Sequence, residues 1–267
     1  MSDTHWIHDI DPILFKIGSF QVRYYGLFFA IAMIQGAWFW IRQIVRSGRT
    51  VSDALPLIWM GIFGAIIGGR IVHVLFYRFD EFLSNPLILI TLGRGGFASH
   101  GSALGLLAAL WFYSRRFKMP YIEALDRFSL SVPLATSLVR MGNFFNSEIV
   151  GRPSDVAWAV IFPVYDRAHG LPLTPRHPSQ LYEVGIGIVV FLILYFTDRR
   201  LGETRPKGLM AGLTLVSYFT LRFFVEFFKS PHVLSESFPL TMGQILSVPF
   251  AVAGLVLIIR ARRFHLK

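Results

Sequence analysis

The sequence predicts an all-α polytopic membrane protein with seven transmembrane helices, a re-entrant or interfacial segment, and a small external head between helices four and five. Hydrophobic residues make up 54% of the 267 residues and charged residues only 16%, which leaves too little polar surface to cover a soluble globule. Lysine and arginine outnumber the acids 26 to 16 and gather in the loops between apolar segments. We expect residues 1–267 to form a single integral membrane domain.

Residues 1–23 form a polar lead-in to the first predicted span. This stretch lacks a basic start and contains three aspartates, so it does not resemble a cleaved signal peptide, and the first span is expected to remain as an anchor. The segments long enough to cross the membrane are about 24–44, 55–77, 97–113 and 121–140, one that follows residues 177–183 and ends near Thr197, and about 208–228 and 240–259.

Basic residues follow the first, third, fifth and seventh spans, and the positive-inside rule places all of these clusters on the cytoplasmic side. The N-terminus is therefore expected outside and the C-terminus in the cytoplasm. The clusters are Arg42, Arg46 and Arg49; Arg115, Arg116 and Lys118; Arg199, Arg200, Arg205 and Lys207; and Arg260, Arg262, Arg263 and Lys267.

The second span carries an arginine, Arg70, three residues before His73. An arginine inside a span needs a partner or a wet cavity, so this face is expected to look inward; the alternative is that the side chain extends to the outer interface. The same span has a small-residue face suited to close helix contact, formed by Gly61, Gly64, Gly68 and Gly69.

A short apolar run from Pro86 to Leu92 precedes the sequence Gly93-Arg94-Gly95-Gly96. The run is too short to span, which favours a re-entrant or interfacial element, and the glycine-rich backbone amides could hold an anion. His100 follows just inside the third span. Most histidines near a membrane interface are structural, but the glycine-rich turn and the expected outer-leaflet depth make His100 a candidate base.

The fourth span leads into the sequence Arg-Met-Gly-Asn-Phe-Phe-Asn-Ser-Glu-Ile-Val-Gly, from Arg140 to Gly151. Arginine offers a planar fork of donors to phosphate oxygens, asparagines donate and accept, and Glu148 can take a proton or orient the arginine. This combination suits an anionic headgroup at the membrane boundary. The alternative is a helix end with an interfacial arginine. Residues 141–178 are expected to form the periplasmic head, with a short strand near 158–162.

The sixth span places Tyr218, Arg222 and Glu226 on one helix face, because they recur every fourth residue. Either Arg222 and Glu226 form an ion pair with each other, or the face is a polar wall of a headgroup site beside Arg140. Glu183, at the outer end of the fifth span, is a candidate partner for Arg140.

The sequence Arg-x-Gly-Asn-Phe-x-Asn-x-Glu-x-x-Gly from Arg140 to Gly151 resembles the signature of the prolipoprotein diacylglyceryl transferases. Three further stretches resemble the same family and occur in its order: Gly-Arg-Gly-Gly…His-Gly at 93–101, Pro-Ser-Gln-Leu-Tyr-Glu at 178–183, and Arg-Phe-x-x-Glu-x-Phe at 222–228.

The resemblance implies a transferase of the bacterial cytoplasmic (inner) membrane with its active site towards the outer leaflet. The implied reaction moves the diacylglyceryl group of phosphatidylglycerol to the thiol of the lipobox cysteine in a prolipoprotein signal peptide. It forms a thioether and releases glycerol 1-phosphate, as the first step of lipoprotein maturation.

We expect the site residues to divide between chemistry and headgroup binding. Arg140 and Arg222 would clamp the phosphate, and His100 is the first choice for the base that takes the thiol proton, with Glu148 or Glu226 as alternatives. The residues expected to orient or surround the headgroup, beside the two arginines, are Tyr25, Asn143, Asn146, Gly151 and Glu183.

The absence of cysteine excludes a thiol nucleophile and a thiolate metal site in this chain, so the reacting thiol must belong to the substrate. We expect no cofactor and no metal, since the histidines show no spaced ligand set, and no nucleic-acid partner. Three other classes fit less well. A transporter often shows an internal repeat, a serine protease needs a base farther from Ser99 and Ser102 than His100, and a purely structural protein would not collect so many polar groups at one depth.

Overall fold

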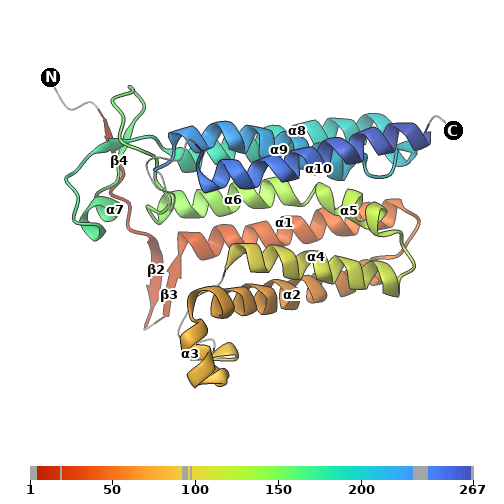
Figure 1. The fold of residues 1–267 in the computed structure, drawn as a ribbon, viewed down its shortest axis with the longest axis horizontal. Coiled ribbons are helices and arrows are strands. Elements are labelled where there is room, and N and C mark those ends of the chain that lie inside the picture. Colours follow the sequence, from red (N-terminus) through yellow and green to blue (C-terminus); the bar gives the residue numbers. More distant parts are fainter. Residues whose placement is uncertain (1–4, 19, 92–95, 97, 231–239, 266–267) are drawn as a thin grey trace. The chain divides into compact units, whose positions relative to one another are not determined.

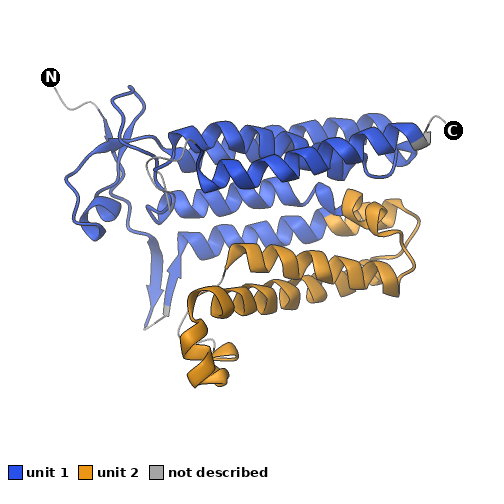
Figure 2. Ribbon diagram, in the orientation of Figure 1, with its two compact units in different colours: residues 1–39, 128–267 blue, residues 40–127 orange. Residues whose placement is uncertain are grey.

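The computed structural model describes residues 5–18, 20–91, 96, 98–230 and 240–265. The chain divides into two compact units: residues 1–39 and 128–267 form unit 1, and residues 40–127 form unit 2 (Figure 2). Within the described residues, five helical segments are long and apolar enough to cross a membrane: Tyr24–Arg46, Val51–Tyr77, Ser179–Thr204, Leu209–Phe228 and Met242–Arg263. These five coincide with the first, second, fifth, sixth and seventh predicted spans, so length and composition indicate a multi-pass membrane protein.

The bounds of the long helices follow from local chemistry as well as from hydropathy. Helix α2 (Val51–Tyr77) begins four residues before the predicted span, because Thr50 and Asp53 form a capping box at its start. The other described helices of 17 residues or more are α1 (Tyr24–Arg46), α4 (Ser99–Arg116), α8 (Ser179–Leu201), α9 (Leu209–Val225) and α10 (Met242–His265).

The third and fourth predicted spans are not among the five. Helix α4 covers the third, but serines and His100 at one end and two arginines at the other lower its apolar content. The fourth is not one helix: α5 (Tyr121–Ser129) and α6 (Val132–Phe145) are separated at Leu130 and Ser131. Pro133, in the first turn of α6, has no N–H to continue the ladder of α5.

The break between α5 and α6 is stabilised by α1 within unit 1. The Ser131 hydroxyl donates to the Gly36 carbonyl at 3.0 Å, and the Gln35 side-chain amide donates to the Ser131 carbonyl, also at 3.0 Å. A backbone interruption among apolar helices needs such partners, since lipid supplies none.

The helices of unit 1 pack through small residues. Helix α6 lies beside α8, where the Ser137 hydroxyl donates to the Val184 carbonyl at 2.9 Å and Gly187 leaves no room for a side chain against Ser137 and Pro133. Helices α9 and α10 meet at Gly212 and Gly254 (Figure 1). Tight helix contact of this kind replaces the hydrophobic driving force that lipid cannot provide.

The fold is not all-α, because short strands precede α1 and follow α6. Strands β2 (Ile13–Ile17) and β3 (Phe20–Arg23) form an antiparallel hairpin in the predicted polar lead-in. Strand β1 (Trp6–Ile7) pairs in parallel with β4 (Val160–Ile161), which pairs antiparallel with β5 (Pro175–Arg176). The strand predicted near 158–162 is thus present as two residues, whereas the strands in the lead-in were missed.

We use "head" for residues 147–178 together with strand β1. Its core is formed by Val150, Val160 and Phe162, which pack against Phe144 at the end of α6. The loop around α7 (Pro163–Ala168) is closed by an ion pair between Arg176 and Asp166, with Nη2 to Oδ1 at 2.9 Å and both side chains buried. The head therefore rests directly on the end of the helix that carries Arg140.

Unit 2 contains α2 and α4, which pack antiparallel with Gly64 against Gly105 and Gly68 against Gly101 (Figure 1). Each of these glycines meets the opposite backbone, so even a methyl group would clash. The predicted small-residue face of the second span is confirmed as the helix contact.

Arg70 is buried and does not extend to an interface. Its guanidinium donates to the carbonyls of Ile88 at 2.6 Å, Thr91 at 2.7 Å, Gly96 at 3.3 Å and Leu89 at 3.4 Å. It thereby holds the short apolar run, which forms a 3-10 turn, η1 (Pro86–Leu89), after α3 (Phe79–Ser84). Residues 92–95 lie outside the described residues, and with them the predicted anion-holding turn.

Candidate active site

The site forms in unit 1 where the last two turns of α6 meet the first two turns of α8. The antiparallel packing of these helices puts Arg140 level with Glu183, and the Arg140 Nε lies 2.7 Å from the Glu183 Oε2. The partner that the sequence suggested for Arg140 is therefore the one in the structure.

Glu183 is the centre of the cluster. Its other carboxylate oxygen, Oε1, accepts from Arg222 Nη1 at 3.0 Å and from Lys229 Nζ at 2.9 Å, and only 1% of its side chain is exposed. A carboxylate that leaves water this completely needs cationic partners to offset the lost hydration. Here three cations from three different segments converge on one carboxylate.

The signature loop adds a second chain of polar contacts. Arg140 Nη1 donates to the Asn143 Oδ1 at 3.3 Å, and Asn143 Nδ2 donates to the Glu148 Oε2 at 3.0 Å. Asn146 Nδ2 donates to the other Glu148 oxygen at 3.3 Å. Glu148 thus orients Arg140 through Asn143, and four predicted site residues form one network.

The turn that presents Glu148 is strained. Ser147 and Ile149, on either side of it, have φ values of 54° and 56°, and a β-branched residue rarely adopts this left-handed conformation. The start of α8 holds the turn: Gln180 Nε2 donates to the Glu148 carbonyl at 2.7 Å, and the Ser179 hydroxyl donates to the Ile149 carbonyl at 2.9 Å. The Ser-Gln part of the fifth-span motif therefore fixes the backbone of the signature motif.

Gly151 has a packing role that explains its residue type. Its N–H donates to the His177 carbonyl at 3.0 Å, and a Cβ there would lie 2.6 Å from the Phe228 carbonyl oxygen. Only glycine lets the backbone at position 151 approach the His177 and Phe228 carbonyls so closely. Whether Gly151 also contacts a headgroup stays a prediction.

Tyr25 and the polar face of α9 lie beside this network. Tyr25 packs on Gly142, where a Cβ would come within 2.8 Å of its ring. Tyr218 lies one helical turn before Arg222 on α9. Glu226 begins the 3-10 turn η4 (Glu226–Phe228) after α9, and its Oε2 lies 3.1 Å from Lys229 Nζ. Arg222 pairs with Glu183 and Glu226 pairs with Lys229, so partners outside α9 join this face to the Arg140 cluster.

His100 belongs to unit 2, where it is exposed in the first turn of α4. Its role as the base stays a prediction. Among the described residues, no three His, Asp or Glu side chains are grouped so that they could hold a metal ion.

Residues 12–260 match the family model described as prolipoprotein diacylglyceryl transferase. The chain belongs to this family. The matched residues include all four motifs that carry the resemblance. They also include Glu183 and its three cationic partners, Arg140, Arg222 and Lys229.

Relatives with similar sequences cover nearly the whole chain. A protein of Pseudoalteromonas atlantica named phosphatidylglycerol–prolipoprotein diacylglyceryl transferase is 42% identical over 95% of this chain and 90% of its own. Proteins of the same name from Vibrio cholerae and Vibrio atlanticus are 40% and 38% identical over 94% and 97% of this chain, and over 91% and 94% of their own.

Sequence reasoning missed Lys229 at this candidate site. It lies just beyond the predicted sixth span, and its spacing of three from Glu226 is a signal for an ion pair at a helix end. No local sequence pattern indicates that Lys229 contacts Glu183, which lies 46 residues away in the chain.

Proposed function

We propose that this chain transfers the diacylglyceryl group from phosphatidylglycerol to the thiol of the lipobox cysteine of a prolipoprotein. The thiolate sulfur forms a bond to the glycerol carbon, the bond from that carbon to the phosphate oxygen breaks, and glycerol 1-phosphate leaves with the electron pair. Family membership supports the reaction class. The observation that carries its assignment to this site is the convergence of Arg140 and Arg222 on Glu183.

Arg140 and Arg222 would hold the phosphodiester and stabilise the charge that grows on it as the carbon–oxygen bond breaks. Each guanidinium has N–H groups beyond those used on Glu183, and their orientation is set before the lipid arrives. Donors that are already in place avoid reorganisation during the reaction, and losing one such donor typically lowers the rate by about 10²–10³-fold.

The thiol proton needs a base, and we assign it to His100, with Glu148 or Glu226 as alternatives. Tyr25, Asn143 and Asn146 would orient the glycerol headgroup. Replacing His100 with Gln in a protein that folds and binds lipid should abolish turnover; wild-type turnover would remove His100 from this role.

The proposed location is the bacterial cytoplasmic membrane, with seven spans, the N-terminus outside and the C-terminus in the cytoplasm. In this topology α4 and the α5–α6 pair complete the seven spans, and the 86–92 run is a re-entrant or interfacial element. The head then lies in the periplasm, where prolipoproteins present their lipobox cysteine.

The reaction is tested on purified protein in detergent, supplied with phosphatidylglycerol and a peptide that carries a lipobox cysteine. We expect a mass gain on the peptide together with release of glycerol phosphate, and loss of both products in a folded Arg140→Ala variant. If neither product forms while the wild-type protein stays folded and binds the lipid, the transferase assignment is wrong.

A further inference from the structure

Lys229 is a buried lysine that contacts two carboxylates of the site. Its Nζ lies 2.9 Å from Glu183 Oε1 and 3.1 Å from Glu226 Oε2, and 7% of its side chain is exposed. In a low-dielectric region, a lysine that is ion-paired with two carboxylates fixes the positions of both.

The backbone of Lys229 is fixed by the head. Lys229 forms a β-bridge with Gly151, and the Arg152 N–H donates to the Phe228 carbonyl at 3.0 Å. The ammonium group is therefore placed by the chain around it, and Gly151 is the residue that allows this approach.

Glu226 has a second cation within reach, because Arg222 lies four residues before it, about one helical turn away. In the structure Arg222 instead pairs with Glu183 at 3.0 Å, while Glu226 pairs with Lys229. The Glu226 carboxylate also packs against Gly243, where a Cβ would lie 2.6 Å from Oε2. If Lys229 lost its charge, Glu226 would be a largely buried carboxylate whose nearest remaining cation on its own segment is Arg222.

We propose that Lys229 is a positioning residue for diacylglyceryl transfer. By holding Glu226, it leaves Arg222 on Glu183, so that the guanidinium groups of Arg140 and Arg222 both remain available to the phosphate of phosphatidylglycerol. Lys229 itself does not contact the lipid. The identity of the anion rests on the proposed function.

A charge-removal cycle tests this on the full chain in nanodiscs. The variants are Lys229→Met, Lys229→Arg, Glu226→Gln and the double variant K229M/E226Q, with Lys16→Met on β2 as a control for loss of an exposed lysine. The dissociation constant of phosphatidylglycerol is measured for each, because binding can be read even in variants that do not turn over. Melting temperatures are recorded alongside.

We expect Lys229→Met to weaken phosphatidylglycerol binding by about tenfold or more, and Lys229→Arg and Lys16→Met to stay within about threefold of wild type. The double variant should bind within about threefold of Glu226→Gln alone, because residue 226 then carries no charge that could draw Arg222 away from Glu183. If Lys229 were needed only for folding, adding Glu226→Gln would not restore phosphatidylglycerol binding to the Lys229→Met variant.

Wild-type affinity in a folded Lys229→Met protein would overturn the proposal. So would a double variant that binds about tenfold more weakly than Glu226→Gln. The comparison of K229M/E226Q with Glu226→Gln tests the proposal even if Lys229→Met fails to fold, because residue 226 is uncharged in both of these variants. Peptide modification is scored separately: a wild-type protein that binds phosphatidylglycerol but modifies no peptide contradicts the proposed reaction, while the binding cycle still tests Lys229.

Discussion

Glu183 lies between Arg140, Arg222 and Lys229 with 1% of its side chain exposed. Desolvating a carboxylate costs several kcal/mol, and removing one partner of a buried ion pair typically costs about 3–5 kcal/mol because the other charge stays behind. The positions of the two arginines are therefore coupled through one residue. Substitutions that remove a charge around Glu183 should therefore affect lipid binding and folding together.

Arg140 should not tolerate replacement by lysine, although the charge is kept. Lysine cannot contact Glu183 through one nitrogen and Asn143 through another, as Arg140 does with Nε and Nη1. We expect Arg140→Lys to lower kcat/KM by about 10²-fold with an unchanged fold, measured by peptide modification. Arg167→Lys, at an exposed position on α7, is the matched control and should keep wild-type activity.

Gly151→Ala should destabilise the protein, because the new methyl group would meet the carbonyls of His177 and Phe228. Overpacking of this kind costs about 1–3 kcal/mol, which a lowered melting temperature would report. The control is Gly185→Ala on α8, where a Cβ has no neighbour within 4 Å and where alanine favours the helix. Equal melting temperatures for Gly151→Ala and wild type would contradict the packing role.

At the scale of single residues, the contacts close in sequence could be predicted and the distant ones could not. Arg140, Asn143, Asn146 and Glu148 lie within nine residues, so their network follows from one motif. Lys229 was missed because its contact with Glu183 depends on how α8, the head and the end of α9 pack.

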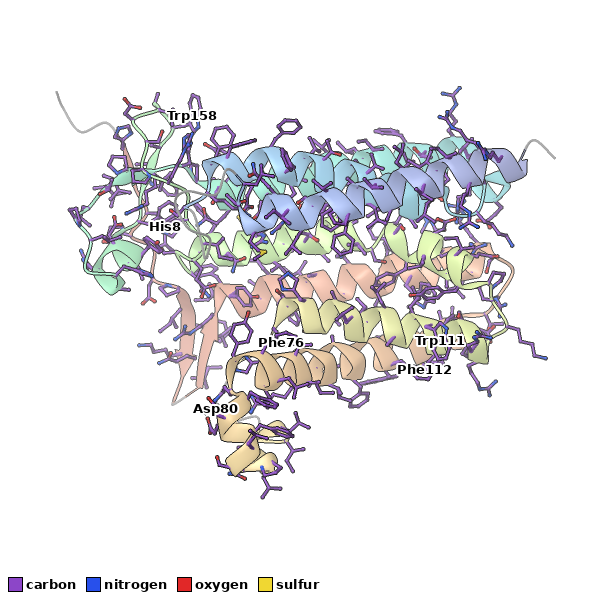
Figure 3. The ribbon with its side chains drawn as sticks, viewed as in Figure 1. His8, Phe76, Asp80, Trp111, Phe112 and Trp158 are labelled. Atoms are coloured by element: carbon purple, nitrogen blue, oxygen red, sulfur yellow. The ribbon has the colours of Figure 1, made fainter. Side chains whose placement is uncertain are left out.

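At the scale of elements, His8, which directly follows strand β1, packs the N-terminal segment against Phe162 and against Phe144 at the end of α6. His8 is fully buried, both ring nitrogens lack a hydrogen-bond partner, and its ring lies 4.5 Å from the Phe144 ring and 5.4 Å from the Phe162 ring (Figure 3). Burial lowers the pKa of His8, although its own backbone and Asp9 act in the opposite direction. The folded state therefore favours the neutral imidazole.

This predicts a loss of stability in acid. An unfolded histidine has a pKa near 6.5, so the contribution of His8 is fully present above about pH 6.5 and is lost as the pH falls towards the lower folded value. The melting temperature should drop by a few degrees between pH 7.5 and pH 5.5, and by less in His8→Phe. His169→Phe, at an exposed histidine, should behave as wild type; an equal drop in all three proteins would argue against His8.

Hydropathy predicted the five long apolar helices within a few residues, because a run of apolar residues has few other stable states in lipid. Hydropathy did not predict features that depend on backbone geometry. The apolar segment continues across Leu130 and Ser131, yet the helix is interrupted there, and α1 supplies hydrogen-bond partners for the freed backbone groups. Of the strands in the lead-in, β1 depends on a pairing partner outside that segment, β4.

At the scale of the whole molecule, the predicted topology places the head outside and the loop between the fifth and sixth spans inside. The absence of native cysteine makes this measurable by labelling single introduced cysteines. In intact spheroplasts, a membrane-impermeant maleimide should label Asp155→Cys in the head and leave Glu203→Cys unlabelled until the membrane is opened. Both positions are exposed, so access to the reagent is the only variable. The reverse pattern would invert the topology.

Composition and adjacent residues are enough to identify a multi-pass membrane protein, its family, and the local motif that carries the arginine, asparagines and glutamate of the site. The bilayer selects apolar helices, and the motif is contiguous. Three other features are visible only in the folded chain: Glu183 contacts three cations, Gly151 makes room for the chain at Lys229, and Arg70 is buried. Those features arise from close approach between segments far apart in the chain, and such approach is set by packing and backbone geometry rather than by residue type.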